Sequence, residues 1–313
     1  MSAISDDYDT PWKDAVTRYF PEFMAFYFPY AHAQIDWLRP HVFLEQELAQ
    51  VVRDAGLGKR RVDKLVRVAR LGGADQWMFI HIDVQGRYDP DFAERVFVYN
   101  YRIYDRYRRP VASLAVLADG RAHWKPDRFG YSVFGCETSI LFPVVKLNDY
   151  RESLDQLLLD SNVFALVTAA HLLTQQSKGN DVQRHAFKWR LVRLLYQRDW
   201  DRQRVVDLFG VIDWMMRLPA ALQSGLMRDI DEMERRCEMP YMNPFEVRGL
   251  KEGRKAGRME GRVEILESIL EARFGVLPKE TKERLAQASG KSLAAWARAA
   301  LDAPTLDQVF CAR

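Results

Sequence analysis

The sequence is poor in cysteine, in long apolar runs and in net charge, and each shortage excludes a class of protein. Its three cysteines, Cys136, Cys237 and Cys311, are far apart, which excludes both a disulfide framework and a zinc site with closely spaced thiols. The most hydrophobic stretch near the N-terminus, YFPEFMAFYFPY, contains two prolines and a glutamate and is too short to span a bilayer. We therefore expect a soluble cytoplasmic protein that does not associate with membranes.

The formal net charge of +3 over 313 residues is too small to indicate nucleic-acid binding by itself, so a basic surface would have to be local. The chain also lacks P-loop, dinucleotide-binding and nucleophile-elbow motifs. Its length and its 48% hydrophobic content support packed domains. Changes in the hydrophobic pattern predict three parts: an α/β domain over residues 1–150, a helical bundle over 151–243, and a tail over 244–313.

Residues 61–85, RVDKLVRVARLGGADQWMFIHIDVQ, carry the most informative pattern. Apolar and polar residues alternate from Val62 to Leu71, and a second apolar run extends from Gln76 to Gln85. Gly72 and Gly73 lie between the two runs, where a hairpin needs positive φ. The segment therefore predicts two antiparallel strands joined by a short turn.

The register of this hairpin places two acids opposite each other. A loop centred on Gly73 pairs Asp63 with Asp83, and Gln85 shares their face because side chains alternate along a strand. Two directly opposed carboxylates repel each other unless water or a positive charge separates them. A hard divalent cation such as Mg²⁺, which binds one or two carboxylates together with water and phosphate, fits this site. The alternative is an open hairpin whose polar face meets water.

The order of several motifs resembles one family of nucleases. Asp63, followed some twenty residues later by Asp83-Val84-Gln85 at the end of a hydrophobic strand, resembles the acidic core of the PD-(D/E)XK nuclease superfamily. More narrowly, the chain is similar to the Rpn family of recombination-promoting nucleases, also described as transposase-like proteins. The matching segments, within residues 9–240, are DTPWKDAV, FLEQEL, VDKLVRV, FIHIDVQG, FAERVFVYNYRIYDRY and LAVLADG.

The resemblance implies a restriction-endonuclease-like α/β core, in which helices flank a mixed sheet, followed by an all-α region. It also implies a bacterial, Mg²⁺-dependent endodeoxyribonuclease, with Mn²⁺ as a substitute, that promotes recombination or transposition-like events on DNA. Asp63 and Asp83 would bind the metal, and Gln85 would orient the attacking water or a phosphate oxygen.

Two residues depart from the pattern of this family. Asp83 stands where the family usually has Glu, and Gln85 stands where many superfamily members have Lys. Glutamine supplies neither a charge nor a proton at neutral pH. These departures leave open a catalytically impaired DNA-binding or recombination-accessory protein on the same fold.

Further candidate residues surround this core. The resemblance carries over Arg95 and Tyr99, on a predicted helix from about Asp91 to Tyr107, as residues that position DNA phosphates. A basic run just before Asp63 is a candidate for the same role, and it consists of Lys59, Arg60 and Arg61. The superfamily often adds an acid from the N-terminal part of the chain, and the candidates here are Asp14, Glu22, Glu45 and Glu47.

The remaining segments predict mostly helices. Residues 11–28 predict either a kinked helix or two short ones, because Pro21 lies inside the apolar pattern. Residues 111–118, VASLAVLA, predict a buried strand. In the tail, glycines recur every four residues from Gly249 to Gly261, which indicates either a linker with helical bias or a close helix contact. The second option leaves open a homo-oligomer through the C-terminal helices, and with it an assembly protein as a third class of function.

Overall fold

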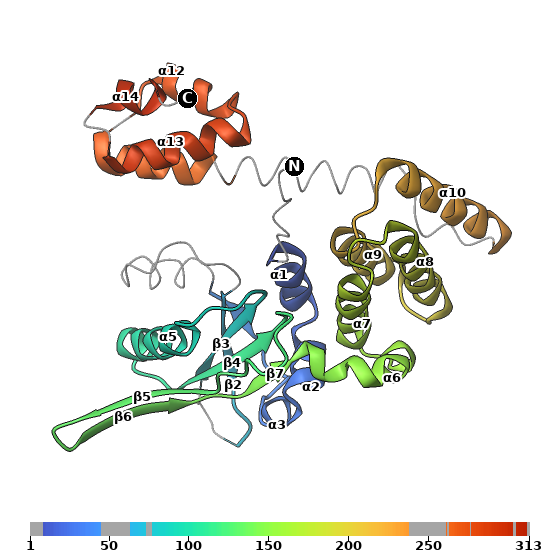
Figure 1. Ribbon diagram of the computed structural model, residues 1–313. Helices are drawn as coiled ribbons and strands as arrows, with labels where there is room; N and C mark the ends of the chain where they lie inside the picture. Colours follow the sequence, from blue (N-terminus) through green and yellow to red (C-terminus); the bar gives the residue numbers. More distant parts are fainter. Residues whose placement is uncertain are drawn as a thin grey trace. The chain divides into compact units, whose positions relative to one another are not determined.

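The computed structural model describes residues 9–44, 63–72, 77–237, 261, 263–275, 277–302 and 305–311 (Figure 1). The chain divides into two compact units, Met1–Tyr241 and Met242–Arg313. None of the helices in these ranges is both long enough and apolar enough to cross a membrane.

The N-terminal segment forms two helices and a single further turn. Helix α1 covers Asp9–Arg18, α2 covers Phe20–Tyr27 and the short α3 covers Pro29–His32. Pro21 lies in the first turn of α2, where its missing N–H costs no hydrogen bond, and the chain leaves helical geometry at Tyr19. Of the two alternatives for residues 11–28, the pair of short helices is therefore confirmed.

A five-stranded sheet forms the centre of the first unit, with the strand order β1-β2-β3-β4-β7. The first three strands pair antiparallel, and the last two pairings are parallel, so the sheet is mixed. Its strands are β1 (Val42–Phe43), β2 (Asp63–Ala69), β3 (Trp77–Gln85), β4 (Val111–Leu117) and β7 (Val144–Lys146). The predicted α/β class, with helices flanking a mixed sheet, is confirmed at this level.

Strands β2 and β3 pair in the register that the sequence predicted. Asp63 is the partner of Asp83, and the pairing continues through Leu65 with His81 to Ala69 with Trp77. Gly72, with φ of +85°, follows β2 in a conformation that glycine adopts without a steric penalty. The period-2 alternation fixed this register, because a slip of one residue would have exchanged the two faces.

Helix α5 (Phe92–Tyr107) covers the face of the sheet that carries Asp83, and α1 and α2 lie on the other side (Figure 1). Near its C-terminal end, Ile103 packs against Leu65 and Phe79, and near its N-terminal end the helix packs against β4. Strand β3 is consequently buried on both faces. The alternative of an open hairpin whose polar face meets water is therefore wrong for β3.

Helices follow the sheet up to residue 237, as the sequence predicted. The central one is α7 (Val163–Gln176), which is buried along nearly its whole length and packs against α2, α6, α8 and α9. Lys188, which is fully buried, forms an ion pair of 2.8 Å with the partly buried Asp213 of a neighbouring helix. The other elements are η1 (Leu147–Ser153), α6 (Leu154–Leu159), α8 (Asp181–Gln197), α9 (Arg202–Met215) and α10 (Ala220–Cys237).

The second unit has its own apolar core. Helix α13 (Gly290–Asp302) contributes Leu293 and Trp296, which lie in a cluster with leucines from residues 263–285. Helices α12 (Lys279–Ala286) and α14 (Leu306–Cys311) complete it. The glycine-spaced segment from Gly249 onward lies outside the described residues, except for Gly261 itself.

Candidate active site

The carboxyl end of β3 brings together the residues that the sequence singled out. Asp83 and Gln85 project from the same face, and Asp63 lies directly opposite Asp83 at the beginning of β2. The side chain of Asp63 is outside the described part of the chain, so only its backbone position is established. Asp83 is only 2% exposed, which is rare for an ionised carboxylate unless a positive group accompanies it.

Arg95 of α5 supplies the positive charge beside Asp83. Its Nη2 donates to Oδ2 of Asp83 and to Oε1 of Gln85, both at 2.9 Å. Its Nη1 donates to Oδ2 of Asp89, in the loop between β3 and α5. One guanidinium group, itself 5% exposed, therefore holds two buried carboxylates and an amide in a fixed arrangement.

The helical repeat explains why Arg95 points inward. Phe92, Tyr99 and Ile103 form the buried side of α5, and Arg95 lies one turn from both Phe92 and Tyr99. Its guanidinium carbon lies 5.1 Å from the centroid of the Phe92 ring. Sequence reasoning named Arg95 but missed Asp89, for which the only signal was an acid six residues before an inward-facing arginine.

A second buried polar side chain, His81, lies two residues before Asp83 on β3 and therefore on the same face of the sheet. His81 is fully buried, its Nδ1 lies 3.4 Å from the hydroxyl of Ser113, and its ring meets the Tyr99 ring edge-on at 5.4 Å. Asn100 donates to the same hydroxyl at 3.0 Å. Burial lowers the pKa of His81 to about 4, although the nearby Asp83 opposes this effect. His81 is therefore neutral at physiological pH and serves as packing beneath the site.

The buried His81 predicts a loss of stability in acid. Its folded pKa of about 4 lies below its ordinary value of 6.5, so the unfolded chain binds the proton first as the pH falls. The contribution of the neutral His81 to the free energy of unfolding is complete above pH 6.5. It is lost between pH 6.5 and pH 4, and the loss amounts to at most about 3 kcal/mol. Urea denaturation of wild type and His81→Gln across this range should show a shallower pH dependence for the variant. The exposed control His123→Gln should keep the wild-type dependence, and three identical profiles would contradict the assignment.

The neighbouring parallel strands carry another buried ion pair, which the sequence did not reveal. The register aligns Gln85 with Leu117 on β4, and Leu117 with Lys146 on β7. The Nζ of Lys146 donates to Asp119, which follows β4, and both side chains are buried. Asn148 donates to the backbone oxygen of Asp119 at 3.2 Å, which ties η1 to the same strand end. The pair holds the carboxyl ends of β4 and β7 together.

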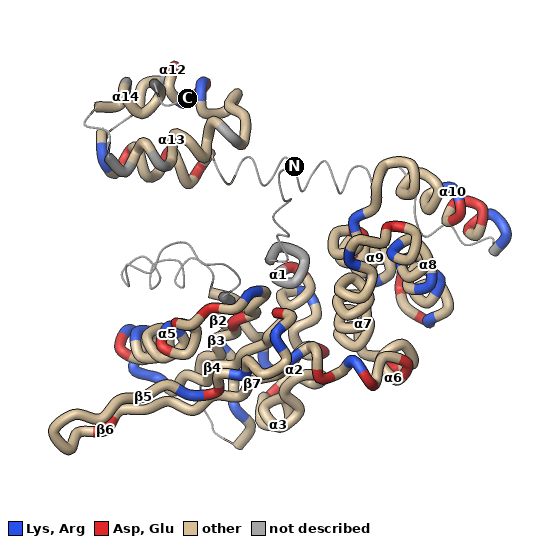
Figure 2. Tube along the Cα trace, in the orientation of Figure 1, with Lys and Arg blue, Asp and Glu red and all other residues tan. Residues whose placement is uncertain are grey.

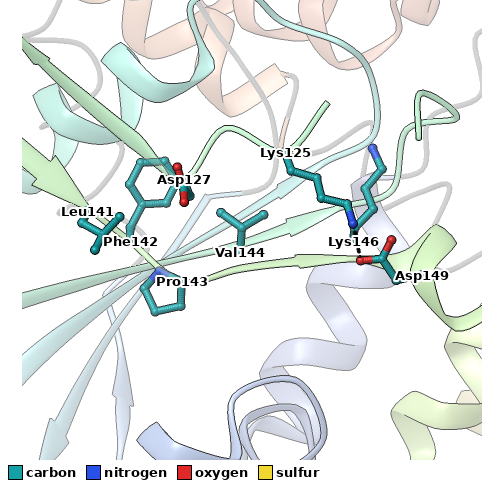
Figure 3. Close-up of a pocket in the computed structure, with 8 residues that line it drawn as sticks. All are labelled: Lys125, Asp127, Leu141, Phe142, Pro143, Val144, Lys146 and Asp149. Carbon is teal, nitrogen blue, oxygen red and sulfur yellow. Dashed lines mark hydrogen bonds and ion pairs between the residues drawn. The ribbon is translucent and has the colours of Figure 1, made fainter. Parts of the chain in front are cut away.

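A hollow of about 600 Å³ lies beside this pair (Figure 3). Each of its lysines is paired with a carboxylate: Lys125 with Asp149 at 2.7 Å, and Lys146 with Asp119. A phosphate would therefore meet no uncompensated positive charge there. The residues predicted for the active site do not line it; its lining consists of Lys125, Asp127, Leu141, Phe142, Pro143, Val144, Lys146 and Asp149.

The other predicted residues are dispersed. Tyr99 is fully buried, a position that favours packing over contact with a phosphate. Glu22 accepts a hydrogen bond of 3.0 Å from Arg204, and Asp14 lies exposed on α1, so neither is shown at the carboxyl end of β3. Five further candidates lie outside the described residues, namely Glu45, Glu47, Lys59, Arg60 and Arg61.

Within the described ranges, no group of three or more His, Cys, Asp or Glu side chains is arranged to hold a metal ion. The side chain of Asp63 lies outside the described part of the chain. Comparisons with protein-family models, with curated proteins and with solved structures gave no match. Membership of the Rpn family and of the PD-(D/E)XK superfamily therefore stays a prediction from the sequence motifs.

Proposed function

We propose that this protein is a metal-dependent DNA endonuclease of the PD-(D/E)XK type that promotes recombination or transposition-like events. The observation that carries the proposal is the direct opposition of Asp63 and Asp83, with Gln85 two residues further along β3. The chain order of two antiparallel strands, a helix and a parallel strand, from β2 to β4, supports it, because the same order underlies the sequence resemblance.

The charges at the end of β3 suit a divalent cation. Asp83 and Asp89 share the single positive charge of Arg95, so these three groups together keep one net negative charge. Asp63, opposite Asp83, would add a second negative charge. Carboxylate and amide oxygens are ligands of Mg²⁺ and Mn²⁺, so Asp63 and Asp83 would hold the ion. When bound, such an ion polarises the scissile phosphate and makes water a stronger nucleophile at neutral pH.

Arg95 acts in this proposal as a positioning residue. Because its Nη2 contacts both Asp83 and Gln85, it fixes the two side chains relative to each other. The amide nitrogen of Gln85 donates one hydrogen to the backbone oxygen of Arg87 at 2.6 Å. Its second hydrogen is the one that would reach a water or a phosphate oxygen. Arg95 is too deeply buried to bind the DNA backbone itself, so this role falls to exposed cations such as Arg87 and to the Lys59–Arg61 run.

The same contact favours one alternative function. Arg95 already neutralises Asp83 in part, and Gln85 supplies no charge in place of the lysine of many superfamily members. A chain that has lost metal binding would keep its fold, because the guanidinium satisfies the buried carboxylates without an ion. The alternative is therefore a DNA-binding or recombination-accessory protein without cleavage activity.

Nicking of supercoiled plasmid DNA tests the proposal. We expect cleavage with Mg²⁺ or Mn²⁺, none with EDTA, and a loss of at least about 100-fold in Asp63→Asn, because removal of a ligand charge weakens the metal site. Asp105→Asn, which changes an exposed acid on α5, is the matched control and should cleave like wild type. Equal cleavage by wild type and Asp63→Asn would remove the proposal, and tight DNA binding without any cleavage would support the alternative.

A further inference from the structure

Strands β5 (Arg128–Val133) and β6 (Cys136–Leu141) form a separate two-stranded sheet that extends away from the main sheet (Figure 1). We call this hairpin the arm. Its strands are joined by Phe134 and Gly135, with φ of +51° and +82°, which is the tight turn that suits a twisted hairpin. The Phe134 side chain at the tip is fully exposed.

The register divides the arm into two unlike faces, because directly paired residues share a face. One face, which we call the apolar face, consists of Phe129, Tyr131, Val133, Cys136, Thr138 and Ile140. The opposite face consists of Arg128, Gly130, Ser132, Glu137, Ser139 and Leu141. Both charged residues of the two strands thus lie on the second face, and the apolar face has none.

The apolar face is covered at its root and exposed toward its tip. At the root, the ring of Phe129 lies 5.4 Å from the ring of Phe97 on α5, and Ile140 packs against the cluster that contains Phe92. Further out, Tyr131 is 54% exposed and Val133 is 49% exposed. The same apolar surface therefore runs from a packed interface into solvent. In soluble proteins, a continuous exposed apolar patch usually marks an interaction site.

Helix α5 also carries an exposed aromatic surface, which resembles the surface against which the root of the arm packs. Tyr101 and Tyr104 follow Phe97 at i+4 and i+7, so the three form one stripe along the helix. Tyr101 is 58% exposed and Tyr104 is 47% exposed. The outer part of the arm and the Tyr101–Tyr104 stripe are thus both exposed. The stripe has the same aromatic character as Phe97, against which the root of the arm packs.

We propose that two copies of this chain dimerise by packing the outer arm of each on the Tyr101–Tyr104 stripe of the other. A two-fold axis satisfies both contacts at once, which is the commonest symmetry of homodimers. Nucleic acid is the less suitable occupant of the arm, because a polyanion needs cations and the apolar face carries none. The outer part of the arm shows no blue in Figure 2, so it contains no Lys or Arg. The interface is independent of the cleavage chemistry, and it is formed by residues of the first unit instead of the C-terminal helices that the sequence suggested for self-association.

Sedimentation velocity of the full-length protein over a range of concentrations tests this arrangement. We expect a concentration-dependent dimer, and we expect Val133→Glu to weaken it at least about tenfold, because the charge would be buried in an apolar contact. Ser139→Glu, on the opposite face and paired across the strands with Gly130, should dimerise like wild type. Both positions are exposed, so neither change threatens folding.

A cross-link then identifies which surfaces meet. In a background of Cys136→Ser, Cys237→Ser and Cys311→Ser, one chain carries Phe134→Cys and a differently tagged chain carries Tyr101→Cys. Mild oxidation should join the two kinds of chain, whereas replacing Phe134→Cys by Ser139→Cys on the polar face should not. A monomer at every concentration, a dimer that tolerates Val133→Glu, or equal losses in Val133→Glu and Ser139→Glu would overturn the proposal. A monomeric wild type whose DNA binding is lost only in Val133→Glu would assign the arm to DNA instead.

Discussion

Replacing Arg95 by leucine should reduce the free energy of unfolding by about 3–5 kcal/mol, the largest stability effect expected in the first unit. The change removes the cation that Asp83 and Asp89 share while leaving both carboxylates buried. It also leaves Gln85 without the donor that holds its amide oxygen. Leucine fills much of the volume of the arginine stem, so the loss reflects uncompensated charge more than a cavity.

Arg108→Leu, at the C-cap of the same helix, is the matched control. Arg108 pairs with Asp105 at 2.8 Å, but the two side chains are 73% and 51% exposed, so this pair should contribute no more than about 1 kcal/mol. Urea denaturation followed by circular dichroism measures both variants. A triple variant, Asp83→Asn, Asp89→Asn and Arg95→Leu, should regain part of the stability, since the buried charges are gone. Equal stability of Arg95→Leu and Arg108→Leu would contradict the buried network.

Asp83→Asn should lower metal-dependent plasmid nicking by at least about 100-fold while costing less stability than Arg95→Leu. The amide keeps an oxygen that can accept the hydrogen bond from Arg95, so the network survives in part. The lost charge is the one that a divalent cation needs. This separation of activity from stability distinguishes a metal ligand from a residue that only holds the fold together.

Asp89→Asn provides the control for Asp83→Asn. Asp89 contacts the same guanidinium and is also buried, but it lies in the loop after β3 and has no register partner in the sheet. It should lose stability to a similar extent and retain nicking within a few-fold of wild type. If the two variants lose nicking equally, the effect belongs to the shared ion network, and Asp83 has no special role as a metal ligand.

The sequence predicted the hairpin register and the helix from about Asp91 to Tyr107 because both follow from short periodicities. Alternation with period two leaves one register for Asp63 and Asp83 once an apolar face is required. The helical repeat likewise places Phe92, Tyr99 and Ile103 on the buried side of α5. Such patterns are local, and a single chain segment is enough to show them.

The features that the sequence did not reveal depend on tertiary neighbours or on the conformation of a loop, and neither follows from a short periodicity. Lys146 meets Asp119 only because β7 lies parallel to β4, and no spacing in the sequence encodes this neighbour. Asp89 binds Arg95 because the loop after β3 folds back onto α5. The two-faced character of the arm depends on which residues oppose each other across its turn.

The most direct test of the central claim is a calorimetric titration of Mn²⁺ into the full-length wild-type protein and into Asp83→Asn. The account predicts saturable binding to wild type, at least about tenfold weaker binding to the variant, and competition by Mg²⁺ for the same site. Identical titrations for the two proteins, or no saturable binding to wild type, would contradict the claim that Asp63 and Asp83 hold a divalent cation.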